Sequence, residues 1–271
     1  YTPEQMHLGG VTLTKLDFPS VGRDGPSDDR SPTTIQEEAD KALTKLNELW
    51  TEAERYARID SAVAVDPETR RKPEFVPAME GLLPVIRGEQ PLMISANAAP
   101  DISKALDWAE ERGVLDQVIL SGAMEGWRVA DDIAAAGVPV LVGSIMQPPS
   151  RESDRYDKAY RTPALLHDAG VTVALRSGKT ENVRNLVFHA GFAASHGLGK
   201  TEALRAVTTT PAQIFGVADQ VGTIETGKRA NLFVATGDPF QPDTDIRHLF
   251  IDGYKLPLDN RQTKLFEEFL N

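Results

Sequence analysis

The chain contains no cysteine among its 271 residues. Disulfide bonds, thiolate metal sites and a cysteine nucleophile are therefore excluded, although the absence does not fix the cellular compartment. No apolar run approaches the ~20 residues that a membrane-spanning helix needs. Basic residues are outnumbered, with 29 Lys and Arg against 40 Asp and Glu, and the formal net charge is −11. We do not expect a nucleic-acid ligand, because phosphate binding requires a concentrated basic surface.

The sequence also lacks an initiator Met and a basic-then-apolar leader, since it starts at Tyr1. We expect one of two explanations. Either a leader has been removed, which would make the protein periplasmic or secreted, or the sequence starts within a longer protein. Charged residues make up 25% and hydrophobic residues 41% of the chain. This ordinary composition predicts a soluble protein of unknown compartment, with one large domain or one domain and an appendage.

The middle of the chain alternates short apolar runs with helical segments. The runs rich in β-branched residues predict strands at 91–96, 117–122, 138–144 and 171–176. The helices expected after the first three runs, near 101–112, 127–136 and 163–169, are each followed closely by Gly. This alternation is typical of parallel strands joined by crossover helices. A fifth strand is expected near Val11 to Phe18.

Further elements are expected on both sides of this region. A loop rich in Gly, Pro, Ser and Asp precedes a long helix from about Ile35 to Arg58, and Thr34 is a candidate N-cap. Two more helices are expected at 185–196 and 201–208. Residues 231–236 and 248–258 look like strands without intervening helices, and Asp252-Gly253 is a hairpin turn signal. We therefore predict a barrel region, residues 1–220, and a C-terminal β appendage, residues 221–271.

The segment from Thr208 to Pro239 carries a dense motif. A helix end of the form T-x-x-P-A-x-x-x-G is followed by V-G-x-I-x-x-G-K-x-A-x-L and a G-D-P turn. The matching positions are Thr208, Pro211, Ala212, Gly216, Val221, Gly222, Ile224, Gly227, Lys228, Ala230, Leu232, Gly237, Asp238 and Pro239. The segment resembles the closing part of metal-dependent amidohydrolases, especially the imidazolonepropionase-like branch.

This resemblance implies an α/β fold, namely a partial or complete (β/α)8 TIM-like barrel with a small β-sandwich appendage formed largely by the C-terminal tail. A complete barrel needs eight strand–helix units. The four or five units found here cover the later part of such a fold well, from roughly residue 80 onward, and the first part poorly.

The resemblance also implies where metal ligands belong. In the family, His-x-His ends the first strand, a His ends each of the fifth and sixth strands, and an Asp ends the eighth. The last three positions fall near Ser95, Ser121 and Ser177, which are weak metal ligands. We therefore expect no bound metal or other cofactor, although the family norm is zinc or another divalent metal. The candidate ligand-pocket residues at the strand ends are Ser95, Asn97, Ser121, Glu125, Ser144, Arg176, Ser177 and Lys179.

Other residues with metal-binding or catalytic chemistry form no recognisable motif. The histidines, none in a ligand-like spacing, are His7, His167, His189, His196 and His248. His189 and His196 are expected to form a partly buried helical stripe. Gly197 to Thr201 ends in the G-K-T of a phosphate loop but is better explained as a helix boundary. Convergence of Asp17, His7 and Glu125 in space is an alternative metal set. The loop with Asp154, Tyr156 and Asp157 either faces a substrate or is solvated.

Three functions remain open. The first is a non-catalytic barrel that binds a small-molecule ligand or a partner, in which Arg176 and Lys179 replace some metal charge or bind an anion. The second is a metal-dependent hydrolase of C–N bonds in small amides or cyclic ureides. The third is a barrel subunit that docks on an active amidohydrolase paralogue, and a homo-oligomer is a further possible assembly. Fold alone does not choose among them.

Overall fold

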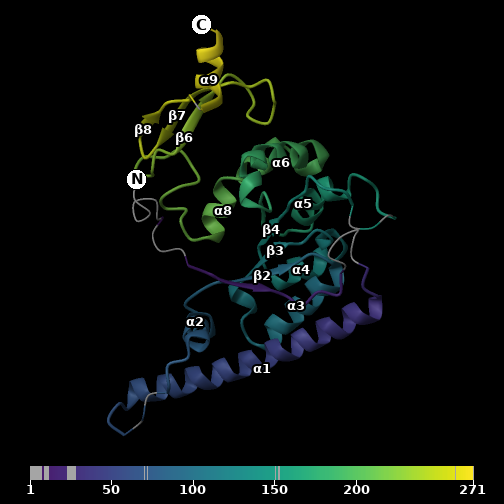
Figure 1. The fold of residues 1–271 in the computed structure, drawn as a ribbon, viewed down its shortest axis with the longest axis vertical. Coiled ribbons are helices and arrows are strands. Elements are labelled where there is room, and N and C mark those ends of the chain that lie inside the picture. Colours follow the sequence, from purple (N-terminus) through teal and green to yellow (C-terminus); the bar gives the residue numbers. More distant parts are fainter. Residues whose placement is uncertain are drawn as a thin grey trace.

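A computed structural model of the chain describes residues 8, 12–22, 29–69, 71, 73–149, 151, 153–259 and 261–270. Its strands are β1 (Thr14–Asp17), β2 (Leu92–Ala96), β3 (Val118–Gly122), β4 (Val140–Val142), β5 (Val173–Leu175), β6 (Leu232–Ala235), β7 (Ile246–Ile251) and β8 (Tyr254–Leu256). Its α-helices are α1 (Pro32–Val65), α2 (Pro77–Ile86), α3 (Ala99–Glu111), α4 (Ala130–Ala136), α5 (Lys158–Asp168), α6 (Leu186–Ala193), α7 (Lys200–Arg205), α8 (Thr209–Ile214) and α9 (Arg261–Leu270) (Figure 1). Short helical turns are η1 (Leu115–Gln117), η2 (Gly126–Arg128), η3 (Thr180–Asn185) and η4 (Ala194–Leu198).

The first five strands form one parallel sheet in the order β1-β2-β3-β4-β5. The parallel arrangement predicted for the middle of the chain is therefore confirmed. The strand expected between residues 11 and 18 is β1, and Val11 lies outside the described residues. Because all five strands run in the same direction, their carboxyl ends lie at one edge of the sheet.

One face of this sheet is covered by helices and forms the main core. Alternate strand residues point to this face, as Ile94, Leu120 and Val140 do, and each is 0% exposed. They pack against apolar side chains of α3, α4 and α5, among them the fully buried Ile102, Ile133 and Leu166. Burying each of these side chains contributes about 1.5–3 kcal/mol to the stability of the fold.

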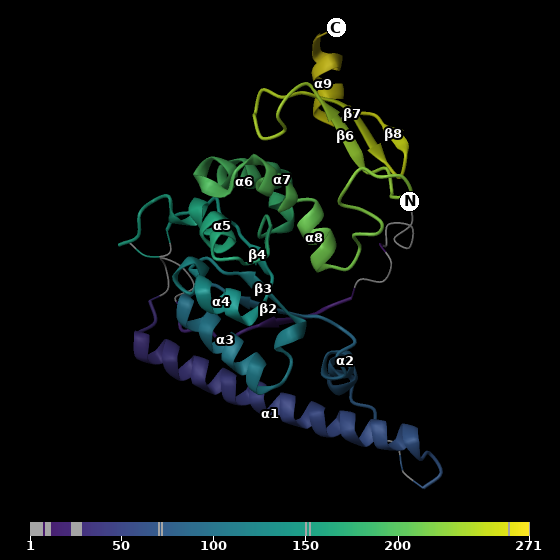
Figure 2. The same cartoon turned by 180° about the vertical axis from the view of Figure 1, so that it is seen from behind.

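The long helix α1 packs on the outer side of α3 (Figures 1 and 2). The rings of Trp50 and Trp108 meet edge to face, with centroids 5.0 Å apart. Asn47 accepts hydrogen bonds from the Trp108 indole at 2.9 Å and from Arg112 at 2.8 Å. An aromatic contact with a satisfied indole fixes the helix in register against α3.

The other face of the parallel sheet carries a smaller apolar cluster and several polar residues. Ile119, Leu141 and Ala174 are buried there, with Met93 of β2 and with Ile214 and Phe215 at the end of α8 packed against them. This cluster occupies the amino half of the strands. Polar side chains follow it towards the carboxyl ends, where the candidate site lies.

The tail forms a separate antiparallel sheet of three strands, in the order β6-β7-β8. Leu232 to Ala235 pairs with β7 as predicted, and Asp252 and Gly253, both at positive φ, make the turn between β7 and β8. The described residues show one sheet here rather than a sandwich. The division of the chain at residue 220 stays a prediction.

Some helix predictions need correction. Ser31, not Thr34, caps α1, because the Ser31 hydroxyl accepts a hydrogen bond from the Thr34 amide at 3.1 Å. The helix starts earlier because Pro32 occupies its first turn, where a missing N–H costs nothing. It also continues to Val65 and ends before Asp66-Pro67, as a following proline favours. No helix among the described residues is long and apolar enough to cross a membrane.

His189 is a buried polar side chain in this fold. It lies on α6 and is 2% exposed, and its Nδ1 atom has no hydrogen-bond partner among the residues that the structure describes. Burial lowers the pKa of His189, because the charged form loses its hydration. At neutral pH the ring is therefore held uncharged in the core.

Stability should fall on acidification because of His189. Above a pH of about 6.5 the ring is neutral in both states, and below it the unfolded chain binds the proton first. The free energy of unfolding should thus decrease from pH 6.5 down to the lower pKa of the folded state. His189→Leu should reduce this decrease in urea titrations. The same change at the exposed His248 should leave it intact, and equal effects would contradict the assignment.

Candidate functional site

The carboxyl ends of β1, β2 and β3 place a row of polar side chains side by side. Asp17 pairs in register with Ser95, and Ser95 pairs with Ser121, so the three residues occupy the same face of neighbouring strands. Lys15, two residues before Asp17, lies on the same face one step towards the amino ends. This strand-end row lies on the face of the sheet opposite to α3, α4 and α5.

Arg176 joins the row from the far side of the sheet. It follows β5, and its guanidinium donates hydrogen bonds to the Ser121 hydroxyl and to the Gly178 carbonyl, the latter at 3.2 Å. To reach β3 its side chain passes the end of β4, where Gly143 stands. A Cβ atom at Gly143 would lie 3.2 Å from Cγ of Arg176. The bare glycine therefore leaves the space that the arginine uses.

The charges of the row fix the state of Asp17. The hydrogen bond from Lys15 is the main cause that holds the pKa of Asp17 below its ordinary value. Burial opposes this, while Ser95 and the charge of Arg176 add to it. The Lys15 ammonium lies 2.8 Å from the Asp17 carboxylate. Two positive side chains and one carboxylate give the row a net charge of +1, in a chain that is acidic as a whole.

Glu125 lies in the loop after β3 but belongs to a different cluster. It is 3% exposed and accepts two hydrogen bonds from Arg151, at 2.6 and 2.7 Å, and one from the Ala99 amide at 3.1 Å. Burial alone would raise the pKa of Glu125, but these hydrogen bonds and the charges of Arg151 and Arg128 lower it. The carboxylate therefore ties the loop after β4 to the first turn of α3, where the helix dipole favours a negative charge.

Two further clusters hold the loops at this edge. The buried Asp101 accepts hydrogen bonds from the Ser20 hydroxyl at 2.5 Å and the Val21 amide at 2.9 Å, which fixes the segment after β1. The Trp127 ring contacts the cations of Arg128 and Lys158, each 4.1 Å from the ring centroid. Sequence reasoning missed both clusters, because their partners are far apart in the chain.

The remaining candidates lie near the row without joining it. The Asn97 side chain packs over Gly122, where a Cβ atom would lie 2.4 Å from its Oδ1. Ser144 packs against Gly178, which links the loops after β4 and β5. The Ser177 hydroxyl donates to the Lys179 carbonyl at 3.2 Å, and the Lys179 side chain is exposed. Ser95, Ser121 and Arg176 are thus the predicted residues that the fold brings together.

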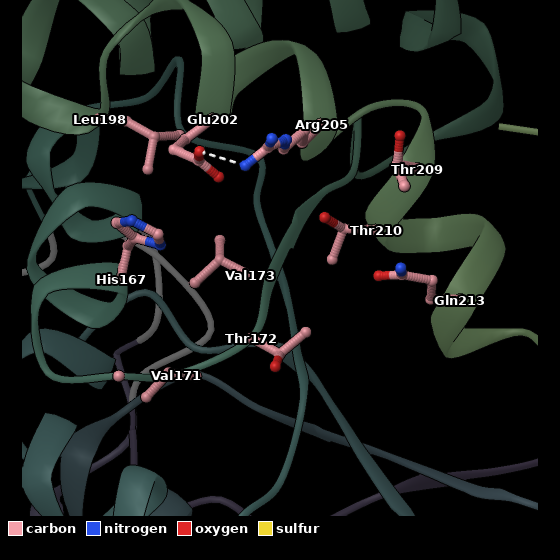
Figure 3. A pocket seen from close by; sticks show the side chains of 11 residues that line it. His167, Val171, Thr172, Val173, Leu198, Glu202, Arg205, Thr209, Thr210 and Gln213 are labelled. Carbon is pink, nitrogen blue, oxygen red and sulfur yellow. Dashed lines mark hydrogen bonds and ion pairs between the residues drawn. The ribbon is translucent and has the colours of Figure 1, made fainter. Parts of the chain in front are cut away.

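A cavity of about 500 Å³ lies elsewhere, at the amino end of β5 (Figure 3). Figure 3 shows His167, Glu202, Arg205, Thr210 and Gln213 around it. Its charged groups already pair with each other, since Arg205 lies 2.8 Å from Glu202. Ligands of parallel α/β sheets bind outside the carboxyl ends of the strands. We therefore place the candidate site at the strand-end row and not in this cavity.

The other motifs have local roles. Lys200 starts α7, so the G-K-T segment is a helix boundary as predicted. His196 lies in η4 beyond the end of α6, where its backbone is not helical, and its ring packs against Tyr160 and Phe192. It does not continue the helical stripe expected from His189. In the loop before α5, Asp154 pairs with Arg128 and Asp157 pairs with Arg155, whereas Tyr156 is exposed.

The fold and the strand-end row define an α/β protein with its polar side chains at the carboxyl edge of a parallel sheet. The family model described as "Amidohydrolase family" matches residues 129–256. Among curated proteins, an N-substituted formamide deformylase from Arthrobacter pascens is 29% identical over 161 residues, which cover 51% of this chain and 30% of the deformylase.

Solved structures agree with this match. An amidohydrolase from Thermotoga maritima MSB8 superimposes with a TM-score of 0.73 at 24% identity, covering 89% of this chain and 61% of that one. An uncharacterized protein superimposes with a TM-score of 0.51 at 18% identity, covering 69% and 51%. Residues 129–256 are therefore similar to the amidohydrolase family, and the chain shares the fold of the amidohydrolase from Thermotoga maritima MSB8. It spans less than two thirds of the length of these relatives.

The strand-end residues that the structure describes do not fit the divalent metal that the family implies. In the described ranges no three His, Cys, Asp or Glu side chains gather as a metal ion would require. The strand ends present Ser95 and Ser121, whose neutral hydroxyls are poor zinc ligands. A guanidinium occupies the same place, since Arg176 is bonded to Ser121. The alternative set of Asp17, His7 and Glu125 includes His7, which lies outside the described residues, and Glu125 is engaged by Arg151.

Proposed function

We propose that the strand-end row binds a small carboxylate-bearing ligand and does so without catalysis. The observation that carries the proposal is the Arg176 side chain, which crosses Gly143 to Ser121, the strand-end position where the resemblance to the family implies a metal ligand. A guanidinium presents several N–H donors in a plane and binds carboxylates in a bidentate manner. Among the residues that the structure describes, its hydrogen bonds go to two protein acceptors, Ser121 and Gly178. The remaining donors are available to a ligand.

The electrostatics of the row support an anion rather than a cation or a neutral ligand. Lys15 and Arg176 outnumber Asp17, and the lowered pKa of Asp17 keeps that carboxylate charged, so its proton does not alter the balance at neutral pH. One bound carboxylate neutralises the excess positive charge. Ser95 adds a half-buried hydroxyl, which donates or accepts as the ligand requires, whereas the buried Ser121 holds the Arg176 guanidinium.

The matched ligands benzoate and benzamide test this proposal. Isothermal titration should show that benzoate binds and that the uncharged amide binds at least about tenfold more weakly, because it lacks the charge that Arg176 recognises. Arg176→Met should abolish benzoate binding, and Arg176→Lys should keep part of it. Arg184→Met is the matched control, because it removes the same charge from an exposed site in η3.

The outcomes separate clearly. If Arg176→Met and Arg184→Met weaken benzoate binding equally, the effect is one of net charge and the site is wrongly placed. If benzamide binds as well as benzoate, the ligand is not recognised through its carboxylate. Binding should also weaken as salt is added, since Lys15 and Asp17 of the row are exposed to solvent.

A second function is favoured by the sequence similarity to the deformylase. That relative acts, by its name, on N-substituted formamides, and a metal-dependent hydrolase of C–N bonds would be the corresponding activity here. The metal ligands would then come from residues that the structure does not describe or from a part of the protein beyond this chain. This second function would be supported if the purified protein held stoichiometric zinc and hydrolysed amides, and if a chelator that removes the zinc also abolished the hydrolysis.

A further inference from the structure

The cavity at the amino end of β5 lies along an open edge of the parallel sheet, because β5 is the last strand in the sheet order. The Thr172 carbonyl accepts a hydrogen bond from β4, and the Arg176 amide donates one to β4, both at 2.9 Å. Backbone groups of successive residues alternate between the two edges of a strand. Those of Val173 and Leu175 therefore point to the outer edge, away from β4.

The chain between α7 and α8 covers one end of this outer edge. The Leu175 amide donates a hydrogen bond to the Ala206 carbonyl at 2.9 Å. Val173, two residues earlier, lines the cavity. Its outward N–H and C=O face this space and not another strand of the described chain. The cavity thus offers one backbone donor beside one backbone acceptor, and Ala206 blocks a longer strand from pairing there.

Polar side chains complete the walls of the cavity. Thr210 and Gln213 point into it from α8 (Figure 3). The interaction drawn among the lining residues joins Glu202 to Arg205, so Thr210 and Gln213 make no hydrogen bond to the other lining side chains. A hydroxyl and a carboxamide each donate and accept hydrogen bonds. These two side chains therefore suit a ligand that carries both donors and acceptors.

The charges of the lining balance each other. Glu202 and Arg205 form an ion pair at 2.8 Å, and histidine is mostly uncharged at a pH of about 7.5. A charged ligand would lose hydration here without gaining a free counter-ion, so the lining favours an uncharged one. The volume of about 500 Å³ lies within the range of about 300–1,000 Å³ that small-molecule sites occupy.

We propose that this cavity is a second binding site, which takes a small uncharged ligand through its amide groups. The ligand supplies an acceptor for the Val173 N–H and a donor for the Val173 carbonyl, as a neighbouring strand would. Thr210 and Gln213 bond to its remaining polar atoms. The strand-end row lies at the opposite end of the strands, so the two sites bind their ligands independently.

Nuclear magnetic resonance titration of the full chain at a pH of about 7.5 tests the proposal. N-acetylalaninamide is the probe. N-acetylalanine, with a carboxylate in place of the terminal amide, is the matched compound and should bind at least about threefold more weakly. The probe should shift the amide resonance of Val173 more than that of Ala174, which faces β4. Equal shifts at the two residues, or equal binding of the two compounds, would overturn the proposal.

A pair of glutamine variants tests the lining. Gln213→Leu should weaken binding of N-acetylalaninamide by about three- to tenfold, because one hydrogen bond is lost. Gln241→Leu is the matched control, since Gln241 is exposed and lies outside the lining. Benzoate binding at the strand-end row should persist in both variants, which shows that both fold. Equal weakening of amide binding by the two changes would contradict the site.

A change at Glu202 tests the charge balance. Glu202→Gln leaves Arg205 without this partner, so the lining gains a net charge of +1. The preference between the two compounds should then reverse, and N-acetylalanine should bind more tightly than N-acetylalaninamide. An unaltered preference would show that the ion pair does not select the ligand and would overturn the assignment of an uncharged one.

Discussion

Replacement of Gly143 by alanine should destabilise the fold by about 3 kcal/mol or more and abolish ligand binding at the strand-end row. Gly143 has a φ of 141°, which side-chain-bearing residues rarely adopt. A Cβ atom there would lie 2.2 Å from the backbone oxygen of Arg176, and this atom cannot move without shifting the end of β5. The shift would part β5 from β4 and withdraw the Arg176 guanidinium from Ser121.

Gly137→Ala is the matched control for this change. Gly137 also has a positive φ, of 69°, but nothing lies within 4 Å of its added Cβ atom. Gly137→Ala should lower the free energy of unfolding by only about 1 kcal/mol, from backbone strain alone. Urea denaturation and benzoate titration of the two variants compare strain with and without a clash. If both cost the same, the close approach of Gly143 to Arg176 is not a feature of the folded protein.

Replacement of Glu125 by alanine should lower the free energy of unfolding by about 2–4 kcal/mol, because its partners lose a buried, charged acceptor. Three hydrogen bonds end on this carboxylate, two from Arg151 and one from the Ala99 amide. Arg151 is half exposed and is hydrated again when the carboxylate is lost. The Ala99 amide begins α3 and is left without its acceptor.

A double-mutant cycle with Arg151→Met separates these contributions. The coupling energy between Glu125 and Arg151 should account for the part of the loss that comes from their hydrogen bonds. The remaining loss comes from the Ala99 amide at the start of α3. The free energy of unfolding of Glu125→Gln should lie between those of the native protein and of Glu125→Ala, because glutamine keeps one acceptor and loses the charge. The lowered pKa of Glu125 adds a pH dependence. The stabilisation is present above a pH of about 4.5 and is lost as the pH falls towards the pKa of the folded state. A flat response in the native protein would show that the carboxylate is not paired.

The parallel strands were predictable because their apolar runs and the glycines between them are local signals. The run from 117 to 122 predicted β3 within one residue of its observed limits. The helix α2 was missed because Gly81 and Pro84 within it are signals that oppose a helix. The helix α9 was missed because it follows two strands and buries no residue.

The strand-end row was predictable only in part. Parallel strands bring Ser95 and Ser121 together once their ends are known, and sequence reasoning can locate such ends. The reach of Arg176 was not predictable, because it depends on the missing side chain of Gly143 on the strand between them. The sequence also does not show which of two neighbouring residues joins the row. Arg176 reaches Ser121, whereas the Ser177 hydroxyl donates a hydrogen bond to the nearby Lys179 carbonyl.

The exposure of the C-terminal sheet determines which part of the protein unfolds locally most easily. None of its strands contains a buried residue, whereas β3 and β4 are buried throughout. Its links to the rest of the chain include the ion pair of Lys200 with Asp238 and the contact of Phe240 with Gly191. Stability is therefore divided unevenly along the chain. The strands β6 to β8 form a unit that unfolds locally at a small fraction of the free energy of global unfolding. Amide protons there exchange through this local opening, long before the parallel sheet releases its own.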